Sequence, residues 1–274
     1  MAEQRALSFA CGGDWLYGVV QVPAAPHQRG VLVVVGGPQY RAGSHRQFTL
    51  LARSLADQGV ATMRFDYRGM GDSEGAMRDF ESVGEDLHAA IDTFFQQVPQ
   101  LQEVVLWGLC DAASAALLYA RGDARVRGMV LLNPWVRTES GAAKATIKHY
   151  YRGRLLEGAF WKKIVSGKFD VRAAALSLVR LLGAASVKPA SGALPDRMHD
   201  ALARFPGKAL VILSGADLTA REFEDLAGAS DKWQRLMQST SITRHALPKA
   251  DHTFSRRDWQ DQVARWTAQW VQSF

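Results

Sequence analysis

Short apolar runs recur along this chain, and they constrain its fold more than any other feature. The run VLVVV at 31–35 contains no polar residue and is followed directly by two glycines. A run of this length is far too short to span a membrane, and it is typical of a strand that is buried on both faces of a parallel sheet. The predicted strands are 31–35, 61–65, 104–107, 129–132, 209–213 and 242–247.

Segments with helical periodicity lie between these strands. The predicted helices are 47–58, 83–98, 112–121 and a C-terminal helix with Trp259, Val263, Trp266 and Trp270 on one stripe. Near the N-terminus, the runs 6–11 and 15–22 flank a Gly-Gly-Asp turn and predict an antiparallel hairpin. The alternation of strands and helices predicts an α/β fold with a mostly parallel, doubly wound sheet.

Composition excludes several other classes of protein. The chain has 274 residues, of which 47% are apolar, so it can bury an ordinary globular core. Two cysteines, Cys11 and Cys110, are too few for a disulfide scaffold, and no Cys or His spacing suggests a metal site. The N-terminus lacks the apolar segment of a signal peptide. We therefore expect a cytoplasmic protein that needs no metal and no cofactor.

The net charge of +6 is concentrated in one stretch of the chain. Residues 137–188 contain 11 of the 33 basic residues and only 3 of the 27 acidic residues. We interpret 135–200 as a helical cap inserted into a core formed by 1–134 and 201–274. The basic surplus has three interpretations: a solvated face, a site for an anionic substrate, or a peripheral contact with an anionic membrane surface. Nucleic acid is not expected, because no recognition motif accompanies the charge.

The sequence GLCDA at 108–112 runs from a predicted strand into a predicted helix. This is the layout of a nucleophile elbow, in which a strained nucleophile requires small residues two positions before and after it. Gly108 and Ala112 meet that requirement, so Cys110 is the predicted nucleophile, in the place where serine is common. The start of a helix favours a thiolate. The alternative is a buried core cysteine.

The acid and the base of such a site are expected on loops after later strands, in the order nucleophile, acid, histidine. Asp217 follows the strand 209–213, and His252 follows the strand 242–247. We therefore expect His252 to act as the base and Asp217 to orient it, with Glu222 as the nearest rival acid. Asp251 is expected to be a structural turn residue.

Two backbone N–H groups are expected to bind the oxyanion of an acyl-transfer reaction. One belongs to Asp111, directly after the nucleophile, and the other to Gln39, because Pro38 in the same loop has no N–H to donate. The alternative is that the Gly-Gly-Pro sequence is only a turn. The tentative substrate-binding residues are Tyr40, Arg41, His45 and Arg46, which follow in the same loop; solvated residues are the equally weighted alternative.

These motifs, together with RFDYRGMGDS at 64–73, resemble the α/β-hydrolase superfamily over nearly the whole chain apart from the cap. More narrowly, GGPQYRAGSHRQF, GLCDAAS and SGADLTAREF resemble the exosortase A system-associated hydrolases of exopolysaccharide-producing bacteria. The cysteine elbow is similar to those of dienelactone hydrolases and polyhydroxyalkanoate synthases. The resemblance implies a structural role for the RFDYRGMGDS loop, held by Arg68 and Asp72, and a role near protein sorting or polysaccharide export.

Three functions are compatible with these residues. The first is hydrolysis of a carboxylic ester or thioester through a Cys-His-Asp triad and an acyl-enzyme intermediate. The second is acyl transfer from the same cysteine to an acceptor other than water. The third is a non-catalytic binding module on the hydrolase fold, which an intact triad in the expected order disfavours. The acyl substrate and the oligomeric state are not indicated by the sequence.

Overall fold

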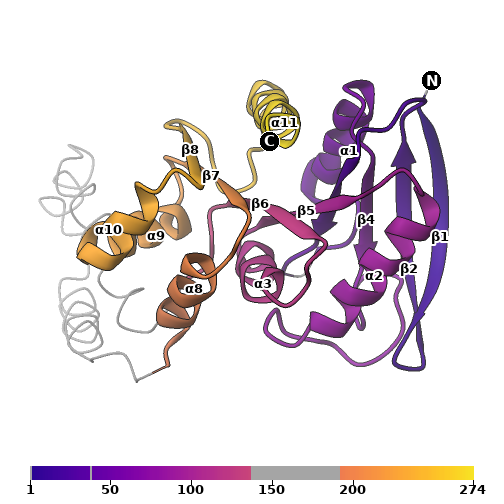
Figure 1. The fold of residues 1–274 in the computed structure, drawn as a ribbon, viewed down its shortest axis with the longest axis horizontal. Coiled ribbons are helices and arrows are strands. Elements are labelled where there is room, and N and C mark those ends of the chain that lie inside the picture. The colour runs from indigo at the N-terminus through magenta and orange to yellow at the C-terminus, as the bar shows by residue number, and fades with distance from the viewer. Residues whose placement is uncertain (1, 38, 137–191) are drawn as a thin grey trace, which may run out of the picture.

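The computed structural model describes residues 2–37, 39–136 and 192–274. These residues form an eight-stranded sheet with the order β1-β2-β4-β3-β5-β6-β7-β8, in which helices cover both faces (Figure 1). The strands are β1 (Glu3–Cys11), β2 (Asp14–Val22), β3 (Arg29–Val34), β4 (Thr62–Asp66), β5 (Glu103–Leu109), β6 (Val126–Leu132), β7 (Lys208–Ser214) and β8 (Ile242–Leu247). Strands β3 to β8 pair in parallel, and β1 and β2 are antiparallel additions at one edge. The predicted parallel sheet with an N-terminal hairpin is confirmed.

The helices among the described residues are η1 (Ser44–Arg46), α1 (Gln47–Asp57), α2 (Gly84–Gln97), α3 (Asp111–Ala120), α8 (Leu194–Ala203), α9 (Leu218–Ala229), α10 (Asp231–Met237) and α11 (Arg257–Val271). Helices α1 and α11 pack on one face of the sheet, and α2, α3 and α8 pack on the other. The sequence did not predict α9 or α10, which follow β7.

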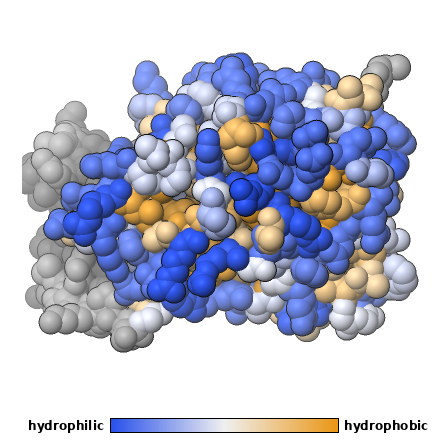
Figure 2. All heavy atoms as spheres, viewed as in Figure 1, coloured by the Kyte–Doolittle hydropathy of each residue, from blue (hydrophilic) through white to orange (hydrophobic). Residues whose placement is uncertain are grey.

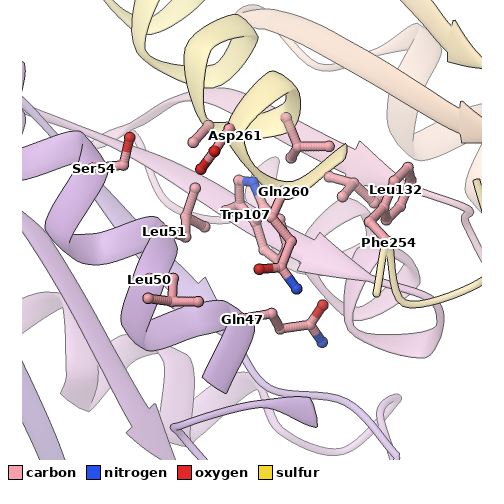
Figure 3. Close-up of a pocket in the computed structure, with 11 residues that line it drawn as sticks. Gln47, Leu50, Leu51, Ser54, Trp107, Leu132, Phe254, Gln260 and Asp261 are labelled. Carbon is pink, nitrogen blue, oxygen red and sulfur yellow. The ribbon is translucent and has the colours of Figure 1, made fainter. Parts of the chain in front are cut away.

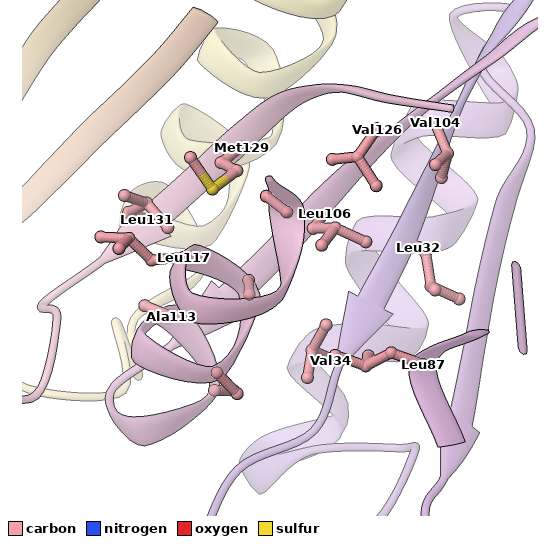
Figure 4. Close-up of a cluster of buried hydrophobic side chains, with 14 of the residues drawn as sticks. Leu32, Val34, Leu87, Val104, Leu106, Ala113, Leu117, Val126, Met129 and Leu131 are labelled. Atoms are coloured by element: carbon pink, nitrogen blue, oxygen red, sulfur yellow. The ribbon is translucent and has the colours of Figure 1, made fainter. Parts of the chain in front are cut away.

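The apolar runs are buried on both faces because successive side chains of a strand point in opposite directions. In β3, Leu32 and Val34 belong to the core under α2 and α3, whereas Val31 and Val33 belong to the core under α1 and α11. Figure 4 shows part of the first core, where side chains of β3, β5 and β6 lie against α3. Each such fully buried aliphatic side chain contributes about 1.5–3 kcal/mol of hydrophobic stabilisation.

The predicted cap at 135–200 lies for the most part outside the described residues, but its C-terminal boundary needs correction. Helix α8 crosses residue 200 and packs on α3, and Met198 is fully buried in the core. Residues 194–200 therefore pack with the sheet and are not part of a separate cap, because an apolar face on α8 completes the cover of that side of the sheet.

The face of the molecule in Figure 2 is covered mostly by hydrophilic residues, with apolar residues in small patches between them. Among the described residues, no helix is both long enough and apolar enough to cross a membrane.

Candidate active site

Cys110 occupies the sharp turn between β5 and α3, and the backbone there is strained. Its φ of 63° and ψ of −125° lie in a region that residues with a side chain rarely adopt. The turn is held from both sides, since Cys110 N–H donates to the carbonyl of Leu132 at 2.9 Å and Trp135 N–H donates to the carbonyl of Cys110 at 3.1 Å. A Cβ on Gly108 would lie 2.5 Å from the carbonyl oxygen of Ala112, so only glycine fits there. Cys110 is half-buried, whereas Cys11 is buried in the core.

His252 lies on the loop after β8 and is held by Asp217, the residue directly before α9. Its Nδ1 is 2.8 Å from Oδ2 of Asp217. The carboxylate of Asp217 also accepts hydrogen bonds from the N–H groups of Thr219 at 3.2 Å and Ala220 at 3.1 Å, which makes it the N-cap of that helix. The positive end of the helix dipole therefore stabilises the charge of the carboxylate that orients the imidazole.

Two hydrogen bonds raise the pKa of His252 to about 10: the bond to Asp217, which has the largest effect, and a bond to Cys110. Burial acts in the opposite direction but is outweighed. His252 therefore lies between the carboxylate and the thiol, and its protonated form is favoured at neutral pH. Such an arrangement suits an imidazolium beside a thiolate nucleophile.

The two other acids considered from the sequence have different surroundings. Asp251 accepts hydrogen bonds from the N–H of Ser255 at 2.9 Å and from its hydroxyl, which is a turn-stabilising role. Glu222 is buried within α9, in the second turn after Asp217. The carboxylate that accepts the hydrogen bond from Nδ1 of His252 is that of Asp217.

The two predicted oxyanion donors line the same pocket. Gln39 and Asp111 both face it, and no described residue accepts a hydrogen bond from the backbone N–H of either one. The side chain of Asp111 joins the two segments, because Oδ2 accepts from Gly37 N–H at 2.9 Å and Oδ1 from Ala112 N–H at 2.9 Å. A Cβ on Gly36 would lie 2.1 Å from Oδ1 of Asp111, so the loop can approach α3 only with glycine at this position.

The pocket at Cys110 has a volume of about 480 Å³. It is lined by Gly36, Gly37, Gln39, Phe48, Phe80, Leu109, Cys110, Asp111, Trp135 and His252. The aromatic and aliphatic members of this set form its apolar walls. The volume lies within the range of small-molecule sites.

The four tentative substrate-binding residues do not line this pocket. The guanidinium of Arg41 binds Asp66 and also Asp72, at 2.6 Å from the latter, so it fastens the loop after β4. Tyr40, His45 and Arg46 are exposed. Arg68 and Asp72, the two residues expected to hold the loop after β4, both form ion pairs: Arg68 binds Asp86 and Glu85, and Asp72 binds Arg41. The sequence does not distinguish a buried ion pair from a solvated charge in this loop.

Asn133, directly after β6, is a site residue that the sequence analysis missed. Its side chain is fully buried, donates to the hydroxyl of Ser214 at 2.9 Å and to the backbone carbonyl of His252 at 3.1 Å, and accepts from Ser214 N–H at 2.9 Å. It thereby ties the loop that carries His252 to the end of β7. Its position at the carboxyl end of a parallel strand, where Asp217 and His252 were sought, was the available signal.

Replacement of Asn133 by alanine is expected to lower the free energy of unfolding by about 2–4 kcal/mol, since three buried hydrogen bonds are lost and the left-handed backbone is strained. Chemical denaturation measures the loss. Ser214→Ala is the control, because it removes only one of these bonds and should cost clearly less. Equal costs for the two variants would contradict the role assigned to Asn133.

A second, much smaller pocket lies between α1 and α11 (Figure 3). Its volume of about 20 Å³ is room for a single water molecule. Trp107 lines it, and its buried Nε1 has no hydrogen-bond partner among the described residues. Within the same residues, no group of three or more His, Cys, Asp or Glu side chains is arranged to hold a metal ion.

The sequence of this chain matches a known family model and curated proteins. The family model described as serine aminopeptidase, S33, matches residues 26–169. The chain is 29% identical over 127 residues to the polyketide transferase grgF of Penicillium sp, a match that covers 44% of this chain and 40% of that protein. The chain thus spans less than half the length of the curated relatives that it matches.

Solved structures resemble the fold over its whole length. An esterase from Pyrococcus furiosus superposes with a TM-score of 0.69 at 12% identity, covering 100% of this chain and 92% of that one. A dienelactone hydrolase from Anabaena variabilis superposes with a TM-score of 0.65 at 17% identity, covering 100% and 98%. At this level of identity the likeness concerns the fold alone.

Proposed function

Because the chain belongs to the serine aminopeptidase S33 family of α/β hydrolases, we propose that this enzyme cleaves a carboxylic ester or thioester, with Cys110 as the nucleophile. The observation that carries the proposal is the imidazole of His252, which bonds Asp217 at 2.8 Å and lines the same pocket as Cys110. A nucleophile, an acid and a histidine in this order along the chain form the constellation that acyl transfer requires.

In the proposed mechanism, the thiolate of Cys110 attacks the acyl carbon, and the N–H groups of Gln39 and Asp111 bind the resulting oxyanion. Collapse of this intermediate breaks the bond to the leaving group, to which the imidazolium of His252 gives its proton. The acyl group then remains on Cys110 as a thioester. The neutral imidazole next takes a proton from water as that water attacks the thioester, and collapse releases a carboxylic acid and the thiolate.

Transfer to another acceptor is the second candidate function. It is favoured by the similarity to a protein named a polyketide transferase, although the two chains match over only part of their lengths. The first half of the reaction is the same, and an alcohol or thiol then replaces water as the nucleophile that takes the acyl group from Cys110.

A panel of esters and acyl thioesters tests the proposal and separates its two forms. Mass spectrometry of the stopped reaction should reveal an acyl adduct on the peptide that contains Cys110. Adding a thiol or alcohol acceptor should divert product from the free acid to the acyl acceptor only if transfer competes with hydrolysis. An adduct on any other residue would refute the nucleophile assignment.

The remaining parts of the proposal rest on the motifs alone. We place the enzyme in the cytoplasm, associate it with exosortase and exopolysaccharide systems, and propose that the basic stretch 137–188 of a helical cap contacts an anionic membrane surface. Residues 137–191 lie outside the described part of the chain. Co-sedimentation with anionic vesicles, but not with neutral ones, is the expected result, and equal binding to both would contradict the membrane contact.

A further inference from the structure

The pocket at Cys110 contains a fixed negative charge beside the nucleophile. Asp111 lines the pocket directly after the nucleophile, and the two oxygens of its carboxylate are held by the N–H groups of Gly37 and Ala112, each at 2.9 Å. These two bonds come from different segments, the loop after β3 and the first turn of α3. The side chain therefore cannot swing away from the pocket without breaking them.

Little positive charge faces this carboxylate across the pocket. Among the described residues that line it, His252 is the one group that carries a positive charge, and it bonds Asp217 and Cys110. Arg41 does not line the pocket, and its guanidinium is bound to Asp66 and to Asp72. An anionic substrate group in this pocket would thus meet the charge of Asp111 without an arginine or lysine from the described walls.

The rest of the wall is apolar. Phe48, Phe80, Leu109 and Trp135 line the pocket, and they offer aromatic and aliphatic surface to a bound group. An apolar acyl chain gains from burial against such surface, whereas an anionic one loses its hydration without a compensating partner.

From this arrangement we infer that the acyl group bound at Cys110 is neutral and apolar, and that Asp111 is the residue that selects against anionic acyl groups. The inference rests on the proposed function and departs from the anionic substrate considered from the sequence. It concerns the charge of Asp111 and is separate from the contribution of its backbone N–H to the oxyanion site.

Alkylation of Cys110 tests the inference without requiring any substrate to be turned over. Iodoacetamide and iodoacetate both alkylate the thiolate at their CH₂ carbon and release iodide. They differ mainly in charge, because iodoacetate is an anion and iodoacetamide is neutral. The ratio of the iodoacetate rate constant to the iodoacetamide rate constant is expected to rise about fivefold in Asp111→Asn, because one repelling charge close to the nucleophile is removed. An unchanged ratio would overturn the inference.

The ratio is insensitive to a loosened site, since loss of the bonds to Gly37 or Ala112 changes both rate constants alike. Asp258→Asn, which removes an exposed carboxylate from α11, is the matched control and should leave the ratio as it is. Asp111→Ser serves as a second variant if the asparagine protein does not fold, because a serine hydroxyl can also accept a hydrogen bond from a backbone N–H group.

A matched pair of substrates links the inference to turnover. The wild-type enzyme should hydrolyse a hexanoyl thioester with a higher kcat/KM than the adipoyl thioester, which carries a carboxylate at the chain end, and Asp111→Asn should reduce this preference. Equal turnover of both by the wild type would overturn the inference while leaving the proposed function intact. Turnover of neither, with a changed alkylation ratio, would refute the proposed function and leave the electrostatic role of Asp111 standing.

Discussion

Replacement of Cys110 by alanine is expected to lower kcat/KM for an ester or thioester substrate by a factor of about 10⁴ or more, in line with the loss of a triad nucleophile. Alanine cannot form the acyl-enzyme intermediate, so the whole covalent route is lost. The variant keeps the backbone N–H groups that bind the oxyanion, but it has no thiolate to attack the acyl carbon. Initial rates measured over a range of substrate concentrations give kcat/KM for the wild type and for the variant.

Cys11→Ala is the matched control for this experiment, because it removes the other cysteine of the chain. Cys11, the last residue of β1, is buried, and burial raises the pKa of its thiol. The control should keep its activity, and iodoacetamide should label Cys110 much faster than Cys11 near neutral pH. Equal activity of wild type and Cys110→Ala, or equal and slow labelling of both cysteines, would show that Cys110 is not the nucleophile.

The sheet could be predicted because its strands carry their own signal. Each interior strand packs between two layers of helices, so the run at 31–35 has to be apolar at every position. Helix α8 could not be separated from the basic stretch before it, because its apolar face, which includes Met198 and Leu202, is short. Its place in the core is decided by packing on α3, a contact between segments far apart in the sequence.

The candidate site is predictable to the extent that it follows the strand order. Cys110, Asp217 and His252 each follow a parallel strand, so a rule about strand ends finds them. Asn133 obeys the same rule but has no reactive group, and only its buried contacts with Ser214 and His252 reveal what it does.

The contacts of the loop after β3 could not be predicted from the sequence. The sequence around Arg41 suggests an anion-binding residue. In the structure, Arg41 instead binds Asp66, at the end of β4, and Asp72, in the loop that follows. The side chain of Asp111 was assigned no role, although it joins Gly37 to the start of α3. Hydrogen bonds between residues far apart in the sequence form only in the folded chain. No periodic pattern in the sequence predicts them.

Asp217→Asn is expected to lower the pKa of His252 from about 10 toward the ordinary value of histidine, since the bond to this carboxylate is the largest cause of the increase. A hydrogen bond to a carboxylate favours the protonated ring, so the wild-type imidazolium persists through neutrality and loses its proton only as the pH rises to about 10. In the variant this loss moves to lower pH. Proton NMR titration of the ring, assigned by comparison with His252→Gln, measures both values.

The kinetic consequence has the same sign. The imidazolium supplies the proton to the leaving group, so kcat/KM of the wild type should fall on the alkaline side near pH 10, after subtraction of the rate measured with Cys110→Ala. In Asp217→Asn this fall should begin at lower pH, and the maximal kcat should drop by a factor on the order of 10³–10⁴, because the ring also loses its orientation.

Two further variants decide which interaction raises the pKa. Cys110→Ala should lower the pKa of His252 less than Asp217→Asn does, because the bond to Cys110 is the smaller of the two causes. Glu222→Gln, which removes the other carboxylate considered from the sequence, should leave the pKa of His252 near 10. If the pKa of His252 stayed near 10 in Asp217→Asn and fell in Glu222→Gln, the acid of the triad would be Glu222. We expect the pKa to fall in Asp217→Asn and to stay near 10 in Glu222→Gln, because Nδ1 of His252 bonds Asp217.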